Sequence, residues 1–535
     1  MTAAKNSVGD AEIHTRNRRV RNALLALIFF GFAVRFASMF WGVGLFSFDH
    51  GYYHPDEPKV VNYVRDFPES FWTASDFRYA LATQHALLVL YLPLKWVAEL
   101  PAVREALPGN ADKLWAFLVC RFGVVLMGTA TVWFVFAAVR QLTGRAGPAL
   151  IGAFVMSLFP YAVLNSGLAA TDAPLAFMIA VVFYVYVLLA DRIPEVHKGW
   201  YGLGILAGIA IGVKYTAAFV GPALCILIVW RYRSAGSSWA TIAPNLARLG
   251  SATGIAFLIV MPHAAFRYPF VKASLQFEMG RIESRAWTIG NYLDCYWTAF
   301  GWPGTVLLLG AILLLAWKRP KGTAALALFT VFFIMVTARG LLDRYVITIT
   351  PLAAIAIGCA AAIPLEANPI ARIVRRVGGY ALLTACALLL VACLYGRYAF
   401  DTRSQVTRFV QENYPPETTV YYAVLGTDKG KQRWRWAHFA PGEYPEVPLG
   451  KKPDLIIATT PRHELIQQDL EDDGRRFIYW RSQYRLEPPT KRWDELYKSL
   501  ATGTNEYRIV KRVPCTILPI EFPGYPLAVY ERQEH

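Results

Sequence analysis

Apolar runs of about 16 to 25 residues recur between positions 23 and 398 of this 535-residue chain. A helix needs about 20 mostly apolar residues to cross the hydrocarbon core of a bilayer, so these runs predict membrane-spanning helices. The composition agrees, because a chain with 55% hydrophobic and only 17% charged residues cannot form an ordinary soluble domain. The sequence therefore predicts a polytopic α-helical membrane protein.

We expect about eleven spans in this part of the chain. The first apolar stretch, 23–46, follows a group of arginines and lacks a cleavage signal, which is typical of a retained signal anchor with its N-terminus inside. The remaining spans are expected at 114–141, 148–168, 171–190, 200–213, 216–230, 246–262, 298–317, 323–338, 345–363 and 379–398. The two short runs at 200–213 and 216–230 are expected to form a hairpin that enters from the cytoplasmic side, with Lys214 at its tip.

Clusters of Lys and Arg between the runs set the orientation, because cytoplasmic loops carry an excess of positive charge. These clusters all face the cytoplasm if the apolar segment 81–100 does not cross the membrane. We therefore expect this segment to be a helix in the outer interface. Its charged residues Lys95 and Glu99 are more typical of an interfacial helix than of a membrane span. Membrane orientation then explains the net charge of +16 without nucleic-acid binding. The pattern predicts an integral membrane protein with a cytoplasmic N-terminus.

The composition changes after Tyr398, where the chain becomes charged and contains no run long enough to span. Four short β-type runs and one helical pattern predict a small soluble α/β domain there, at 419–424, 454–459, 508–513, 527–530 and 493–500. The predicted organisation is a cytoplasmic tail at 1–22, a transmembrane domain at 23–400 with its first outer loop at 47–113, and an extracytoplasmic domain at 401–535.

The sequence HPDEP at 54–58 places two adjacent carboxylates, Asp56 and Glu57, about eight residues beyond the first apolar run, on the expected outer face. A membrane transferase needs a carboxylate base at such a position. The alternative is structural, because Asp56 could cap a helix that continues to Arg65. A further acidic residue, Asp172, stands where one apolar run ends outside and the next begins, and it too could serve as a helix start.

Four segments carry a resemblance to a known family. They are HPDE at 54–57, TDAPLAFMIAVVFYVYV from Thr171, GLGILAGIAIGVKYTA from Gly202 and DRYVITITPLAAIAIG from Asp343. In this order they resemble glycosyltransferase family 39 and its bacterial relatives in the GT-C superfamily, which include the dolichyl-phosphate-mannose-protein mannosyltransferases and the lipid A aminoarabinose transferase. The resemblance implies a GT-C fold and a sugar donor linked to a polyprenyl phosphate, used on the outer side of the membrane.

The resemblance also implies roles for the acidic residues. It places Asp56 at the position of the catalytic base, with Glu57 beside it to assist or orient. Asp172 matches a second acidic residue that faces the first. The charge of Glu57 would raise the proton affinity of Asp56, which would help Asp56 to act as a base near neutral pH.

Lipid phosphate must be held by cations, and few lie within the spans or at their ends: Arg35, Arg121, Lys214, Arg339 and Arg344. Lys214 and Arg344 stand in family-like segments and are the expected phosphate ligands. For Arg344 the alternative is a salt bridge with Asp343 or an interfacial position. Arg121 is a weaker phosphate candidate, and Arg35 is expected to pair with a neighbouring helix.

Substrate contacts are expected from His54, His85 and Tyr345, although a loop histidine with an ordinary structural role is the alternative for His54. The histidines form no HExxH motif or His/Cys cluster, so the sequence predicts no metal centre, while a contribution from a divalent cation stays open. At 79–85 the sequence YALATQH departs from the Pro-Pro-Leu run of many relatives.

The predicted chemistry follows from the leaving group. A polyprenyl phosphate leaves as a weakly basic anion, so transfer needs an activated acceptor but no strong general acid. A single displacement with one carboxylate base would invert the anomeric carbon. The sequence thus predicts a membrane glycosyltransferase whose partners are this donor and a protein, lipid or polysaccharide acceptor. The alternative is a polytopic transporter or lipid flippase without transferase activity.

Overall fold

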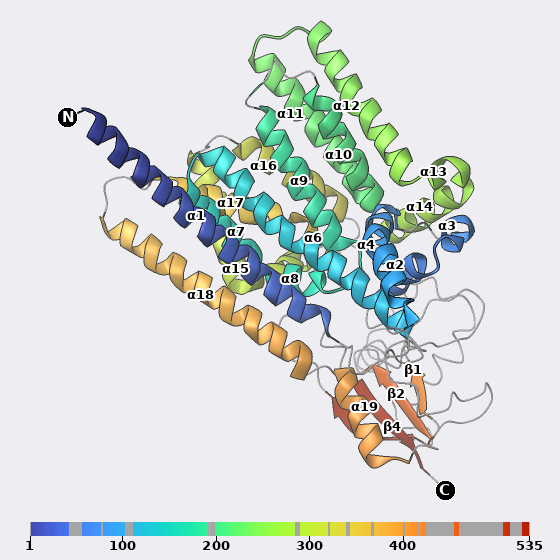
Figure 1. Cartoon of the computed structure of the whole chain (residues 1–535). Coiled ribbons are helices and arrows are strands. Elements are labelled where there is room, and N and C mark those ends of the chain that lie inside the picture. The colour runs from blue at the N-terminus through green and yellow to red at the C-terminus, as the bar shows by residue number, and fades with distance from the viewer. Residues whose placement is uncertain are drawn as a thin grey trace.

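The computed structural model describes residues 2–41, 56–75, 77, 79–101, 111–190, 192, 198–283, 289–318, 322–338, 343–364, 369–399, 402–415, 418, 420–423, 454–459, 507–513 and 527–533. Helices dominate these residues (Figure 1). They are α1 (Thr2–Met39), α2 (Glu57–Arg65), α3 (Glu69–Thr73), α4 (Ala82–Ala98), α6 (Ala111–Thr143), α7 (Ala146–Leu158), α8 (Pro160–Ser166), α9 (Asp172–Ala190), α10 (Gly199–Val213), η2 (Tyr215–Phe219), α11 (Val220–Ser234), α12 (Trp239–Val260), α13 (His263–Phe266), α14 (Tyr268–Glu283), α15 (Ile289–Lys318), α16 (Thr323–Ala338), η3 (Asp343–Ile349), α17 (Thr350–Ala362), α18 (Pro369–Ala399) and α19 (Thr402–Asn413). The strands are β1 (Val420–Ala423), β2 (Leu455–Thr459), β3 (Tyr507–Val513) and β4 (Leu527–Arg532).

Seven helices in the described part of the chain are long and apolar enough to cross a membrane. They lie at Asn17–Met39, Leu114–Thr143, Asp172–Ala190, Tyr215–Ser234, Trp239–Val260, Ala299–Lys318 and Arg376–Tyr398, each at an expected span. The bent pair α7 and α8 would make an eighth. The other expected spans coincide with α10, α16 and α17, which have only 15, 16 and 13 residues, so the count of about eleven stays a prediction.

The bend between α7 and α8 replaces the single straight span expected at 148–168. Phe159 is extended and Pro160 begins α8, and the two helices meet at 63°. Proline cannot donate a backbone hydrogen bond and disfavours helical geometry in the residue before it. Arg35 of α1, which is fully buried, donates from Nη2 to the Met156 carbonyl near the end of α7 at 3.0 Å. The expectation that Arg35 pairs with a neighbouring helix is confirmed.

Three glycines one turn apart bring α10 against α12, and Figure 1 shows these helices with α11 on the flank opposite α1 and α18. A Cβ at Gly204 or Gly208 would lie 2.5 or 2.3 Å from a carbonyl oxygen of α12, and one at Gly212 would lie 2.3 Å from Val260. The backbones of α10 and α12 therefore approach each other more closely than larger residues allow, as small-residue stripes permit in membranes.

This packing gives a testable prediction. Gly208→Ala is expected to lower the free energy of unfolding by about 1–3 kcal/mol, because the added methyl group meets the Thr253 carbonyl. Gly202→Ala on the same helix is the matched control, since a Cβ there meets nothing within 4 Å. Thermal unfolding of the two purified variants checks this difference, and equal unfolding temperatures would contradict the packing.

The helix break expected at Lys214 is present. Lys214 is extended, with φ −157° and ψ 132°, between the end of α10 and the start of η2. The second arm is longer than expected, because η2 and α11 together form the 20-residue stretch Tyr215–Ser234. This stretch is long enough to cross a membrane, and the hairpin stays a prediction.

The helices α2 and α4 pack on the N-terminal end of α6 in a separate apolar cluster that includes Val61, Tyr91 and Phe117. The opposite face of α4 is exposed at Val89 and Trp96. A helix of 17 residues with one buried and one exposed apolar side fits the predicted interfacial position of 81–100 better than a span.

The described C-terminal residues form α19 and a four-stranded sheet in the order β1-β2-β4-β3. The strands β1 and β2 are parallel, and the other pairs are antiparallel. Val406 and Val410 of α19 pack against Leu455, Ile457 and Val529. All four strands lie where the sequence predicted them, and the helix expected at 493–500 falls outside the described residues. Figure 1 shows the sheet beyond the C-terminal end of α18.

Candidate active site

The acidic pair lies at the first turn of α2. Asp56 occupies the N-cap position, but its backbone is helical, with φ −93° and ψ −18°, and its side chain makes no capping hydrogen bond. Both side chains are buried, with Asp56 8% exposed and Glu57 0% exposed. The helix thus begins at the position predicted by the alternative in which Asp56 caps a helix that continues to Arg65. The Asp56 carboxylate, however, does not cap this helix.

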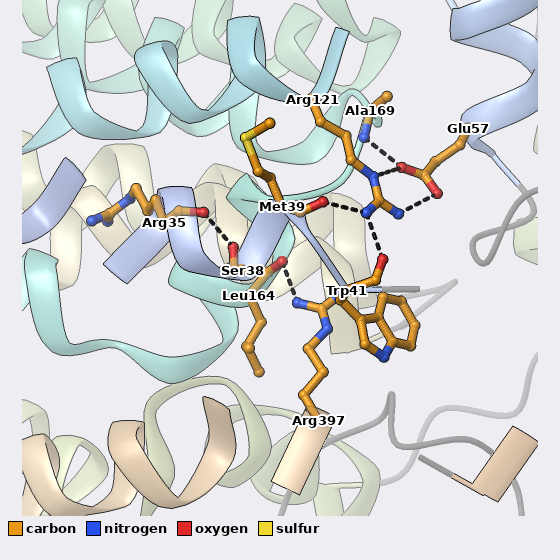
Figure 2. A network of polar contacts seen from close by, with 9 residues as sticks. All are labelled: Arg35, Ser38, Met39, Trp41, Glu57, Arg121, Leu164, Ala169 and Arg397. Atoms are coloured by element: carbon orange, nitrogen blue, oxygen red, sulfur yellow. Dashed lines mark hydrogen bonds and ion pairs between the residues drawn. The ribbon is translucent and has the colours of Figure 1, made fainter. Parts of the chain in front are cut away.

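Glu57 forms a fully buried ion pair with Arg121 of α6. Arg121 donates from Nε to Oε1 at 2.8 Å and from Nη2 to Oε2 at 3.0 Å. The Ala169 backbone N–H also donates to Oε1, at 2.9 Å (Figure 2). This fork geometry is the strongest form of arginine–carboxylate pairing and satisfies charges that would be costly alone in the protein interior.

The pairing bears on the role expected for Glu57. Arg121 places a cation beside Glu57, and this cation opposes the repulsion that Glu57 would exert on Asp56. The raised proton affinity of Asp56 stays a prediction. The ion pair ties the first turn of α2 to α6, which favours the orienting role of the two predicted for Glu57.

Arg121 also joins the two ends of the segment 42–55. Its Nη1 donates to the carbonyls of Met39 and Trp41, at 2.6 and 2.7 Å, at the end of α1. Its guanidinium carbon stands 4.0 Å from the ring centroid of Phe117. These contacts engage four of the five N–H groups of a guanidinium and support a structural role. Phosphate binding by Arg121 stays a prediction.

Asp172 and Lys214 form a second buried ion pair. Lys214 Nζ lies 2.5 Å from Asp172 Oδ1, and the side chains are 8% and 4% exposed for Lys214 and Asp172. The helix α9 starts at Asp172, so this residue lies in the first helical turn, while its carboxylate reaches Lys214 at the break after α10. The sequence singled out both residues without pairing them, since Asp172 was expected to face Asp56 and Lys214 to bind the phosphate.

One short loop connects the two ion pairs. Ala169, which donates to Glu57, precedes Asp172 by three residues in the loop between α8 and α9. The loop is buried throughout. Glu57, the neighbour of Asp56, is therefore bound to the loop that leads directly into Asp172, and the expectation that Asp56 and Asp172 face each other stays a prediction. The structure brings together Glu57, Arg121, Asp172 and Lys214 around this loop.

His85 lies in a neighbouring aromatic cluster. Its Nε2 is 3.0 Å from the Tyr63 hydroxyl, and His263 Nε2 is 2.7 Å from the Phe71 carbonyl. Burial lowers the pKa of His85, as does the nearby His263, while a hydrogen bond with the Val260 backbone opposes this. Burial likewise lowers the pKa of His263. Both rings are therefore expected to be neutral at pH 7, and substrate contact by His85 stays a prediction.

The structure describes no side-chain contacts for three of the expected site residues, His54, Arg344 and Tyr345. His54 lies outside the described residues. Arg344 and Tyr345 belong to η3, whose backbone packs against α9 and α15. Their roles at the phosphate and the substrate stay predictions. The described residues contain no group of three or more His, Cys, Asp or Glu side chains that could hold a metal ion.

Comparisons with known proteins complete this geometry. Residues 114–266 match the family model of the dolichyl-phosphate-mannose-protein mannosyltransferases. The solved structure of ArnT from Cupriavidus metallidurans bound to undecaprenyl phosphate superposes with a TM-score of 0.54 at 12% identity, covering 94% of this chain and 97% of that one. This chain has the GT-C fold. The resemblance predicted from the sequence is confirmed.

Other GT-C proteins are more distant. AglB from Archaeoglobus fulgidus, with an inhibitory peptide and a dolichol-phosphate, has a TM-score of 0.42 at 12% identity and covers 73% of this chain and 58% of that one. The S. cerevisiae Pmt1-Pmt2 complex, bound to its sugar donor, has a TM-score of 0.35 at 18% identity and covers 47% of this chain and 34% of that one. No curated protein matches the chain.

The matched region contains Arg121, Asp172 and Lys214 but begins after the acidic pair. The role of Asp56 therefore depends on the geometry at the start of α2. Trp41 and Arg397 were not singled out from the sequence. Figure 2 shows Trp41 next to Arg121, and Arg397 next to Trp41. Their only sequence signal is a position at the outer end of a predicted span.

Proposed function

We propose that this protein is a membrane glycosyltransferase that moves a sugar from a polyprenyl-phosphate donor to an acceptor on the outer face of the membrane. The observation that carries the proposal is the buried Asp56, held at the start of α2 by the Glu57–Arg121 ion pair without capping the helix. A carboxylate buried and fixed in this way is a candidate for proton transfer.

Asp56 would remove the proton of the acceptor hydroxyl or amine as the acceptor attacks the anomeric carbon. The bond between this carbon and the phosphate oxygen breaks, and the polyprenyl phosphate leaves with the bonding electrons. One displacement inverts the anomeric carbon. Lys214 would stabilise the charge that develops on the phosphate, and Asp172 would hold its ammonium group in place.

The ArnT structure with undecaprenyl phosphate supports a polyprenyl-phosphate ligand for the shared fold. The expected orientation places the acidic pair and the C-terminal region outside the membrane, with the N-terminus in the cytoplasm. The C-terminal α/β region, at 401–535, would then be available to select a protein, lipid or polysaccharide acceptor. The location proposed for the whole chain is the bacterial inner membrane.

The proposal is tested with purified protein in lipid nanodiscs. A polyprenyl-phosphate-linked sugar labelled in the sugar is supplied together with an envelope fraction from a strain that lacks the gene. Transfer of label to that fraction, with release of polyprenyl phosphate and inverted configuration, is expected. Movement of the intact donor between leaflets of proteoliposomes, without release of polyprenyl phosphate, would instead support the flippase alternative. Retained configuration would contradict the single displacement.

Lys214 gives a more specific prediction. Lys214→Met is expected to raise the donor KM by about 10- to 100-fold, because the variant removes the cation proposed to contact the phosphate and leaves Asp172 buried as an unpaired anion. Steady-state kinetics with varied donor measure this change. The double variant Lys214→Met with Asp172→Asn separates the two causes, since it removes the buried anion but does not restore the cation. A double variant with the normal donor KM would contradict phosphate binding by Lys214.

A further inference from the structure

The C-terminal end of α18 is fastened to the ends of two other helices. Arg397 is fully buried, and its Nη1 donates to the Leu164 carbonyl near the end of α8 at 2.6 Å. The Tyr398 hydroxyl donates to the Ala37 carbonyl near the end of α1. Cationic and hydroxyl donors are favourable at these positions, because the last carbonyls of a helix lack partners within the helix and carry its negative dipole end.

Arg397 also contacts Trp41, the residue on which two arginines converge. The guanidinium carbon of Arg397 stands 4.1 Å from the indole ring centroid, while the Trp41 carbonyl accepts from Arg121 at 2.7 Å (Figure 2). Trp41 is 1% exposed. A cation over a tryptophan face interacts most strongly when water is excluded, as it is here.

These contacts form one continuous chain, Arg397–Trp41–Arg121–Glu57, from α18 to the first turn of α2. Each step joins side chains that are almost or fully buried. Because these side chains are closely packed, a displacement of Arg397 would displace its neighbours along the chain of contacts. The ion pair joins α6 to α2, in addition to their apolar packing. The contact of Arg397 with Trp41 adds the end of α1 and the end of α18 to the same unit.

We infer that Arg397 is a positioning residue for the acidic pair. It holds Trp41, Trp41 holds Arg121, and Arg121 with Glu57 sets the direction in which Asp56 presents its carboxylate. Because α19 begins at Thr402, Arg397 is also where the C-terminal region is attached to this unit. The catalytic consequence rests on the proposed function, whereas the mechanical coupling between α18 and α2 does not.

The experiment uses the full chain in nanodiscs with Arg397→Gln, Trp41→Leu and the double variant. Each single variant is expected to lower kcat per folded molecule by about 10-fold or more, with the donor KM within about threefold, because only the orientation of the base is lost. The double variant is expected to be no slower than the slower single variant, since both changes break one link. Arg397→Lys, which keeps the cation but not the planar fork, is expected to lie between Arg397→Gln and the parent protein.

Hydrogen–deuterium exchange provides a readout that does not depend on activity. Peptides covering 57–65 are expected to exchange at least about threefold faster in Arg397→Gln, while peptides within α9 keep the exchange rate of the parent protein. Arg376→Gln, an exposed position on the same helix, is the matched control and is expected to change neither kcat nor exchange. If Arg397→Gln does not fold, Arg397→Lys and Trp41→Phe replace the stronger variants.

The outcomes are separable. Normal kcat and normal exchange of 57–65 in folded Arg397→Gln would overturn the inference, as would additive losses in the double variant. Loss of folded protein in every variant, with normal kcat for the fraction that folds, would reduce Arg397 to a structural residue. If the parent protein transfers no sugar, the proposed function fails, and the exchange measurement still decides the coupling.

Discussion

Replacing Asp56 with asparagine is expected to lower kcat about 10²- to 10⁴-fold, because the acceptor would lose the group that takes its proton. Asparagine has nearly the shape of aspartate, and Asp56 makes no capping hydrogen bond that the change would remove from α2. The ion pair beside it, Glu57 with Arg121, keeps both partners. The donor KM and the unfolding temperature are therefore expected to stay close to those of the parent protein.

The measurement is transfer from the labelled polyprenyl-phosphate donor, with the amount of folded protein determined separately. Asp66→Asn is the control, because Asp66 follows the same helix but is exposed and pairs with its neighbour Arg65. We expect this control to keep normal kcat. An Asp56→Asn variant with more than a third of the parent kcat would exclude Asp56 as the base.

Local features of the site were predictable from the sequence because they depend on neighbouring residues. Two carboxylates just past an apolar run predicted an acidic helix start, and Asp56 and Glu57 stand at the first turn of α2. The break at Lys214 followed from an ionisable residue between two apolar runs. Alternation of apolar residues located the four C-terminal strands.

Pairings between distant residues were not predictable in this way. Glu57 and Arg121 are 64 positions apart, and Asp172 and Lys214 are 42 apart, so no local pattern links them. Each ion pair joins side chains from two elements that meet only in the folded bundle. The bend at Phe159 was missed because hydropathy is nearly uniform across it, even though Pro160 marks the position.

The second large effect is expected at Arg121. Arg121→Met should lower the free energy of unfolding by about 3–5 kcal/mol, because it removes the guanidinium that pairs with the fully buried Glu57 carboxylate. The carbonyls of Met39 and Trp41 lose a donor at the same time. Unfolding of the purified variant in detergent, followed by intrinsic tryptophan fluorescence, measures this loss.

Two further variants identify the cause of the stability loss in Arg121→Met. Glu57→Gln is expected to cost less than Arg121→Met, since the guanidinium that remains still donates to two carbonyls and lies over the Phe117 ring. Adding Glu57→Gln to Arg121→Met should recover part of the stability, because the buried anion is then removed.

An exposed pair provides the comparison. Lys95 and Glu99 stand 4.0 Å apart on α4 with side chains 37% and 59% exposed, so Lys95→Met is expected to change stability by no more than about 1 kcal/mol. If Arg121→Met is no more costly than Lys95→Met, the buried ion pair does not hold α2 in place. The position of Asp56 would then depend on the apolar packing of α2 against α6 and α4, because these are the other described contacts that hold α2.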